Sequence, residues 1–264
     1  MLKRYAADFL KTVLPARYYG KAAEVYNGAR NVRRIASFIG IKHYCPCCGW
    51  RLRKFLPFGV VTRPNARCPR CWSLERHRLL WLYLKERTRV FTDPHRLLHF
   101  APETVFKSAF TSLDNLDYIT ADLDSSRTMV KVDITDIPYE DDSFDAVICS
   151  HVLEHVKDDR KAMGELYRIL RPGGWAILMV PISGETTFED PSITAPEDRE
   201  RFFGQWDHVR MYGADFADRL ERAGFYVDVV RYARELGERR IRRYGLQESD
   251  DIFLCTKPLA KSFE

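Results

Sequence analysis

Apolar and polar positions between residues 133 and 182 follow two different periodicities in turn. Residues 144–149 form a short, apolar, partly β-branched run, which is typical of a strand buried on both faces of a parallel sheet. Apolar residues then recur at helical spacing over residues 163–170, and Pro172-Gly173-Gly174 is expected to end that helix. A second apolar run covers residues 175–182. This order of strand, helix and strand predicts a βαβ unit.

The same patterns extend to both sides of this unit. Further strands are predicted at residues 116–122, 225–232 and 252–256, and further helices at residues 74–89 and 215–224. Residues 183–212 lack a strong periodicity, and the charged residues 234–245 are interpreted as a loop. Residues 1–40 show helical spacing interrupted by Pro15 and Gly20, so we expect two or three basic amphipathic helices there.

Two C-x₂-C pairs near the amino terminus contain four of the seven cysteines: Cys45, Cys48, Cys68 and Cys71. In a cytosolic protein this spacing indicates metal ligands rather than disulfides. Two thiolates from each tight turn complete a tetrahedral, closed and therefore structural zinc site. Cys47 is interpreted as a bystander, and His43 and His77 are alternatives should one thiolate be replaced. With a hairpin over residues 50–61, the pairs predict a zinc-ribbon-like module.

Four short motifs occur in order through the βαβ region. They are Asp133, the approach to a strand over residues 137–145, Leu153-Glu154-His155-Val156, and Leu170-Arg171-Pro172-Gly173-Gly174. In this combination the chain resembles a class I S-adenosylmethionine-dependent methyltransferase of the small-molecule type, over roughly residues 96–257. The resemblance implies an α/β, Rossmann-like, doubly wound seven-stranded sheet that is mostly parallel, with an antiparallel last pair of strands.

The predicted domain organisation has three parts. Basic amphipathic helices occupy residues 1–40, the zinc-ribbon-like module with its linking helix occupies residues 41–91, and the methyltransferase domain occupies residues 92–264. The implied cofactors are S-adenosylmethionine for the large domain and a structural Zn²⁺ for the module.

The resemblance places a cofactor loop after the first strand of the sheet. Here the chain departs from the family pattern, because His99 stands where an acidic residue is expected. Ala101, Pro102 and Glu103 stand where glycines normally let the backbone approach the cofactor. Glu103 is a candidate acceptor for the cofactor amino group. A domain that has lost catalysis is therefore one alternative.

The other cofactor residues are expected at the ends of the next strands. Asp122 lies 21 positions after Ala101, near the spacing at which a carboxylate accepts hydrogen bonds from a ribose in doubly wound folds, and Asp124 is the alternative. The resemblance places the Asp133 carboxylate at the adenine amino group and the Ile134 backbone beside the ring. Ser150 follows the fourth strand and completes the predicted crevice.

Candidate catalytic residues follow the fourth and fifth strands. Methyl transfer from a sulfonium depends mainly on alignment, and a base is needed only for a hydroxyl or ammonium acceptor. His208, paired with Asp207, is the first candidate base, and His151 is the second. Glu154 and His155 are interpreted as helix-start packing rather than chemistry.

Charge is distributed unevenly along the chain. Residues 1–90 contain 20 Lys+Arg against 4 Asp+Glu, whereas residues 91–264 contain 22 against 33. A basic front predicts an anionic partner, namely RNA, anionic lipid or a phosphorylated substrate. The alternative is a solvated basic face docked on the acidic domain.

Three functions fit these observations. The first is methylation of an unidentified acceptor, a small molecule or sugar; the second is RNA methylation with a zinc module for RNA binding; the third is cofactor binding without catalysis. No apolar run reaches membrane-spanning length and no signal core opens the chain. We therefore expect a cytoplasmic protein, with peripheral contact at the inner membrane surface as an extension of the lipid alternative.

Overall fold

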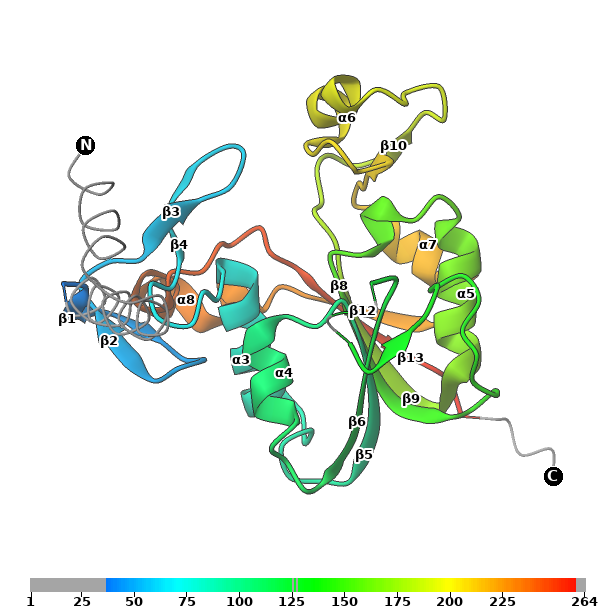
Figure 1. The fold of residues 1–264 in the computed structure, drawn as a ribbon, viewed down its shortest axis with the longest axis horizontal. Coiled ribbons are helices and arrows are strands. Elements are labelled where there is room, and N and C mark those ends of the chain that lie inside the picture. The colour runs from blue at the N-terminus through cyan, green and yellow to red at the C-terminus, as the bar shows by residue number, and fades with distance from the viewer. Residues whose placement is uncertain (1–36, 125, 127, 260–264) are drawn as a thin grey trace, which may run out of the picture.

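The computed structural model describes residues 37–124, 126 and 128–259. The helices predicted within residues 1–36 lie outside this part. Figure 1 shows a central twisted sheet with helices on both faces and a smaller β-rich module beside one end of it. Ile39, expected in a helix, instead begins a strand.

A seven-stranded sheet forms the centre of the large domain. Its strands are β5 (His95–Phe100), β6 (Leu116–Asp122), β7 (Val130–Lys131), β8 (Phe144–Ser150), β9 (Leu170–Met179), β12 (Tyr226–Val230) and β13 (Ile252–Thr256). Their spatial order is β12-β13-β9-β8-β5-β6-β7, and only β13 pairs antiparallel, with β12 and with β9. This confirms the predicted doubly wound sheet with an antiparallel last pair.

Helices cover both faces of this sheet and bury two separate apolar cores. On one face α5 (Asp159–Ile169) and α7 (Phe216–Arg222) contribute Met163, Leu166 and Leu220 to one core. On the other face α3 (Glu75–Arg87) and α4 (Thr104–Phe110) contribute Leu80, Phe106 and Phe110 to the second. Among the described residues, no helix is both long and apolar enough to cross a membrane.

The structure differs from the predicted elements in three places. Helix α5 passes directly into β9, so Pro172-Gly173-Gly174 lies inside that strand, where the register against β8 shifts. Residues predicted as a charged loop form helix α8 (Tyr232–Tyr244), kinked at Gly237, because packing against β1 and α3 stabilises a highly charged sequence. The predicted irregular region contains β10 (Phe188–Glu189), α6 (Pro196–Phe203) and β11 (Arg210–Met211).

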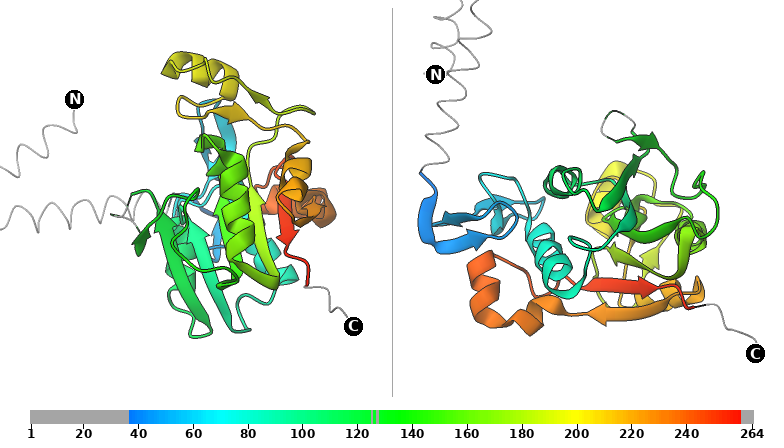
Figure 2. Two further views of the ribbon diagram at one scale, coloured as in Figure 1. Left: turned by 90° about the vertical axis from the view of Figure 1, so that its right-hand side faces the viewer. Right: turned by 90° about the horizontal axis from the view of Figure 1, so that it is seen from below.

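Two hairpins build the small module. Strand β1 (Ile39–Cys45) pairs with β2 (Trp50–Leu52), and β3 (Leu56–Phe58) pairs with β4 (Arg63–Arg67). The single hairpin predicted for residues 50–61 is therefore wrong. Trp50–Leu52 pairs antiparallel with β1, which ends at Cys45, and not with a strand later in the chain. The right-hand view of Figure 2 shows α8 alongside β1 and β2.

Candidate functional site

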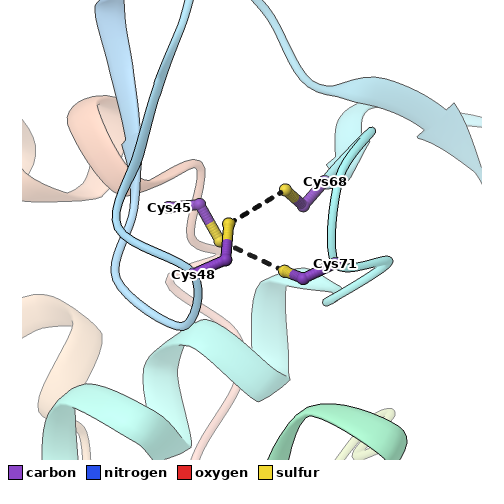
Figure 3. Close-up of side chains that lie close together, drawn as sticks. All are labelled: Cys45, Cys48, Cys68 and Cys71. Carbon is purple, nitrogen blue, oxygen red and sulfur yellow. Dashed lines mark hydrogen bonds between the residues drawn. The ribbon is translucent and has the colours of Figure 1, made fainter. Parts of the chain in front are cut away.

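Four cysteines meet between the two hairpins of the small module. One thiol comes from each end of each C-x₂-C pair, and the four sulfurs lie within 4.8 Å of one another. Contacts of 3.6 Å join Cys45 to Cys71 and of 3.8 Å join Cys48 to Cys68 (Figure 3). Tetrahedral Zn–S bonds of about 2.3 Å place sulfurs about 3.8 Å apart, so the thiols fit this ion.

Each cysteine pair is closed by the same backbone turn. Gly49 N donates to Cys45 O at 2.9 Å, and Trp72 N donates to Cys68 O at 3.1 Å. Gly49 and Trp72 both adopt positive φ, at 72° and 64°. The glycine in the first turn was expected, whereas the left-handed tryptophan in the second had no sequence signal.

The alternative ligands lie elsewhere. Nδ1 of His43 is 2.8 Å from the Arg242 carbonyl oxygen, and His77 contacts the cofactor loop instead. Cys47 Sγ lies 3.8 Å from the His77 carbonyl oxygen and is not part of the four-sulfur group. None of these three residues belongs to the four-sulfur group, which consists of the four predicted cysteines.

Strand register brings the predicted cofactor residues to one edge of the sheet. Phe100 is paired with Ala121 on one side and with Cys149 on the other. The next residues, Ala101, Asp122 and Ser150, therefore lie side by side at the carboxyl ends of three parallel strands. This edge is where open α/β sheets bind their ligands.

Two features of this edge fit a bound ligand. Ala101 has φ of 45°, the conformation for which glycine is normally used, so the chain adopts the cofactor-loop turn without the glycine. The Ser150 hydroxyl is buried and has no hydrogen-bond partner among the described residues. A ligand polar group at this point would satisfy it.

His99 and Glu103 belong to the interior of the cofactor loop. The His99 ring is fully buried, with Nδ1 3.0 Å from the Tyr118 hydroxyl and Nε2 3.2 Å from Glu103 Oε2. Burial acts to raise the pKa of Glu103, but the hydrogen bond from His99 and the nearby His77 lower it to about 2. His99 is thus a core residue that positions Glu103, which is a correction to its predicted place at the crevice surface.

The two residues predicted to face adenine, Asp133 and Ile134, follow β7. Asp133 is exposed, and Oδ1 accepts hydrogen bonds from the backbone and side chain of Thr135, which lower its pKa. Ile134 is buried. The carboxylate of Asp122 also accepts a backbone hydrogen bond, from Asp124 N at 3.0 Å.

A cavity of about 510 Å³ adjoins the Ser150 end of the crevice. Its walls come from the β3–β4 loop, the ends of β8 and β9, the segment before β11 and the loop before β13. His151, Glu154, His155 and His208 line it, whereas Ala101, Asp122 and Asp133 do not. The predicted cofactor residues and the histidines therefore occupy adjoining parts of one sheet edge.

The histidines pair differently from the prediction. Asp207 Oδ2 lies 3.3 Å from His155 Nδ1, and His208 Nδ1 lies 2.9 Å from the Phe203 carbonyl oxygen. The predicted Asp207–His208 pair is therefore wrong at the level of contacts. His151 Nδ1 lies 3.1 Å from Glu154 Oε1, and burial followed by the charge of Arg76 lowers the pKa of His151.

Two neighbours of His208 are structural. Arg210 is buried and donates to the carbonyl oxygens of Leu153, Val156 and Lys157. The Tyr212 hydroxyl donates to Asp159 Oδ2 at 2.8 Å. The sequence Asp207-His208-Val209-Arg210 therefore fastens the segment after β9 to the turn after β8.

Sequence reasoning missed two roles. Glu154 and His155 were interpreted as packing, yet both face the cavity. His77, on α3, reaches the cofactor loop, with Nε2 3.5 Å from Glu103 Oε1. The only available signal for the first pair was the recurrence of His and Glu after the fourth strand; no pattern pointed to the second.

A pH-dependent stability is expected from Asp250, a half-buried residue in the cavity wall. Burial and the charge of Glu75 raise its pKa from 3.8 to about 6. A raised carboxyl pKa means that ionisation costs the folded state stability above pH 6, and that this cost disappears as pH falls below 4. Asp250→Asn should therefore stabilise the protein at pH 8 by about 1–2 kcal/mol and less at pH 4.5. Thermal unfolding at both pH values measures this, with exposed Glu248→Gln as control; equal gains at both would contradict it.

Comparison with known proteins agrees with this architecture. Residues 105–178 match a family described as methyltransferase domain. The demethylmenaquinone methyltransferase of Clavibacter sepedonicus is 32% identical over 113 residues, 38% of this chain and 46% of that protein. The chloroplastic 2-methyl-6-phytyl-1,4-hydroquinone methyltransferase 1 of Oryza sativa subsp. japonica is 26% identical over 118 residues, 45% of this chain and 32% of that protein. The chain thus spans less than half the length of these relatives.

Among solved structures, the cyclase SpnF is similar in fold, with a TM-score of 0.51 at 16% identity, covering 88% of this chain and 93% of that chain. The strand order is that of the class I methyltransferase fold, and residues 105–178 within it are similar to the methyltransferase domain family. The relatives that this chain matches are methyltransferases named for quinone-type substrates. Those names describe the relatives' acceptors and not the acceptor of this chain.

Proposed function

We propose that this protein transfers a methyl group from S-adenosylmethionine to a small polar acceptor bound in the 510 Å³ cavity. The observation that carries the proposal is the juxtaposition of the three-strand crevice with a histidine-lined cavity at Ser150–His151. The relatives' sequence similarity supports the reaction class.

The crevice residues would hold the cofactor, which supplies an activated methyl group on a sulfonium. Asp122 would accept from the ribose hydroxyls, and the left-handed turn at Ala101 would let the backbone approach. His151 directly follows Ser150 and pairs with Glu154, so a carboxylate orients its ring. We place His151 ahead of His208 as the base, because a carboxylate would stabilise the imidazolium that forms on His151, whereas Nδ1 of His208 faces only a neutral carbonyl.

The chemistry of the cavity wall favours a polar acceptor. Charged side chains from several elements line it, including Arg63, Glu75, Arg76 and Asp250. Arg63 and Glu75 pair with each other at 3.0 Å, but Arg76 and Asp250 form no ion pair among the described residues, so a prenylated ring packed against them would desolvate charged groups. A sugar or other small polar molecule therefore fits better than the quinone-type acceptors named for the relatives.

The test is incubation of cell extract with the purified protein and isotopically labelled S-adenosylmethionine, followed by separation into small-molecule, lipid and RNA fractions. Label in the small-molecule fraction is expected. Calorimetry that detects no cofactor binding would overturn the proposal in favour of the non-catalytic alternative.

A second candidate, RNA methylation, is favoured by one surface of the module. Trp72 is 50% exposed and the Arg67 guanidinium lies 4.5 Å from its ring, while the exposed Arg70 lies 4.5 Å from the Trp50 ring. Aromatic and guanidinium planes of this kind stack on unpaired bases. Label in the RNA fraction would support this candidate.

Loss of the ribose acceptor should weaken cofactor binding. Asp122→Ala would leave two ribose hydroxyls without a charged acceptor, a cost of about 1.5–3 kcal/mol or roughly 10- to 100-fold in Kd. Titration calorimetry with S-adenosylmethionine measures this. Asp124→Ala, two residues on, is the matched control and should bind normally; the reverse result would assign the ribose to Asp124.

The basic front is proposed to recruit an anionic partner. Arg51, Arg53 and Lys54 are exposed on the described module, and contacts with phosphate weaken steeply with salt as counterions are released. Binding of the full chain to RNA and to vesicles containing anionic lipid should fall between low and physiological salt, and fall further when these three residues are changed to glutamate. If neither RNA nor anionic vesicles bind at low salt, the basic residues of the module form only a solvated face and recruit no anionic partner.

A further inference from the structure

A second group of metal-ligating side chains lies in the wall of the acceptor cavity. One ligand atom from each of Glu154, His155 and His208 lies within 4.8 Å of the other two. Two imidazoles and a carboxylate form the donor set of open three-ligand sites for divalent transition ions. We propose that these residues bind such an ion, with its remaining coordination positions facing the cavity.

The hydrogen bonds of the two histidines leave a nitrogen on each ring available. His208 Nδ1 lies 2.9 Å from the Phe203 carbonyl oxygen, which can only accept, so Nδ1 carries the proton and Nε2 carries the lone pair. His155 Nδ1 lies 3.3 Å from Asp207 Oδ2, which favours the same tautomer. Metal-binding histidines characteristically donate their other N–H to a carbonyl or carboxylate in this way.

The carboxylate of Glu154 provides an independent observation. Its residue is 1% exposed, and its Oε2 has no hydrogen-bond partner among the described residues. Oε1 faces His151 Nδ1 at 3.1 Å, so Oε2 is the carboxylate oxygen that remains unpaired among the described residues. A buried carboxylate is costly unless it is paired or bound to a metal, and an ion on Oε2 would satisfy it.

The ligands are held in place by two different parts of the chain. Glu154 and His155 belong to the short helix η1 (Leu153–His155) after β8, whereas His208 precedes β11. Val209 N donates to the Glu154 carbonyl oxygen at 2.9 Å, and Arg210 binds the carbonyls around η1. The rings of His155 and His208 meet edge to face at 4.7 Å. The backbone thus brings the three donors together before any ion binds.

An ion at this position would also restrict which class of methyl acceptor the cavity binds. This extension rests on the proposed function. At its open coordination positions the ion would bind the hydroxyl oxygen of the acceptor, and this would lower the pKa of that hydroxyl. The site therefore favours a hydroxyl-bearing acceptor and O-methylation.

Zinc stoichiometry tests the site without any use of methyl transfer. Full-length protein is dialysed against micromolar Zn²⁺, and bound metal is measured. Wild type should hold two ions, whereas His155→Ala, His208→Ala and the nearly isosteric Glu154→Gln should hold one, with affinity for the second reduced at least 10-fold. His95→Ala, at the opposite end of β5, is the control and should hold two.

Two results would overturn the site. These are a wild type that binds no ion beyond the one that Cys45→Ser removes, and variants that retain the second ion while circular dichroism shows them folded. If those variants do not fold, Asp207→Asn takes their place, because it keeps all three metal donors. It should weaken binding of the second ion by removing the carboxylate that orients His155. Unchanged affinity for the second ion would also count against the site. Cofactor binding measured in parallel separates this outcome from failure of the proposed function.

Discussion

Serine in place of Cys45 or Cys68 is expected to remove the bound zinc and unfold the small module. We propose one structural zinc on the four-cysteine cluster, where the S···S contacts of 3.6 and 3.8 Å match tetrahedral zinc. The module has a small core of its own, with Leu52 and Phe55 as its large buried side chains. Structural zinc contributes on the order of 10 kcal/mol to such units, so the Tm should fall by about 10 °C or more.

Metal analysis and thermal unfolding of the purified variants measure this result. Cys47→Ser is the matched control, because Cys47 lies in the same turn but outside the four-sulfur group. It should keep its zinc and most of its stability. Wild-type protein without stoichiometric zinc at this cluster, or a Cys47 variant that loses it, would refute the assignment.

Alanine in place of Arg78 should be almost as damaging. This guanidinium is fully buried and donates to four carbonyl oxygens, those of Ala66, Ser73, Tyr244 and Gly245. It thereby joins the module, α3 and α8. Burial lowers the pKa of Arg78 and the Cys45 thiolate acts to raise it, so the guanidinium also offsets the charge of the cysteine cluster.

The expected cost of Arg78→Ala is about 3–5 kcal/mol, because several buried carbonyls and the thiolate charge lose their partner together. Denaturant unfolding measures it. Arg78→Lys keeps the charge but cannot reach four acceptors with a planar fork, so it should lose less. An alanine variant as stable as wild type would show that the module does not depend on this docking.

Local pattern was sufficient for the centre of the fold. Strand β6 occupies the predicted residues 116–122, and β8 exceeds the predicted 144–149 by one residue. Both are buried strands, in which the apolar run itself reports burial. The spacing of the cysteine pairs likewise identified the four thiols that meet, because each C-x₂-C turn presents two sulfurs on its own.

Other elements depend on contacts that no local window contains. Helix α8 was interpreted as a loop because its sequence is highly charged, and it is stabilised from outside by β1 and α3. His99 stands at a position where the family pattern expects cofactor contact, yet aromatic rings from α4 and β6 enclose it.

The sequence by itself therefore determined the sheet, which residues lie at its strand ends and which four cysteines meet. Only the tertiary structure decided the histidine site, because Glu154 and His208 lie far apart in the chain and meet through the Val209 and Arg210 hydrogen bonds. It also decided the partner of Asp207 and the role of Arg78. Periodicity reports which side of an element is buried, but it carries no information about which distant side chain arrives opposite it.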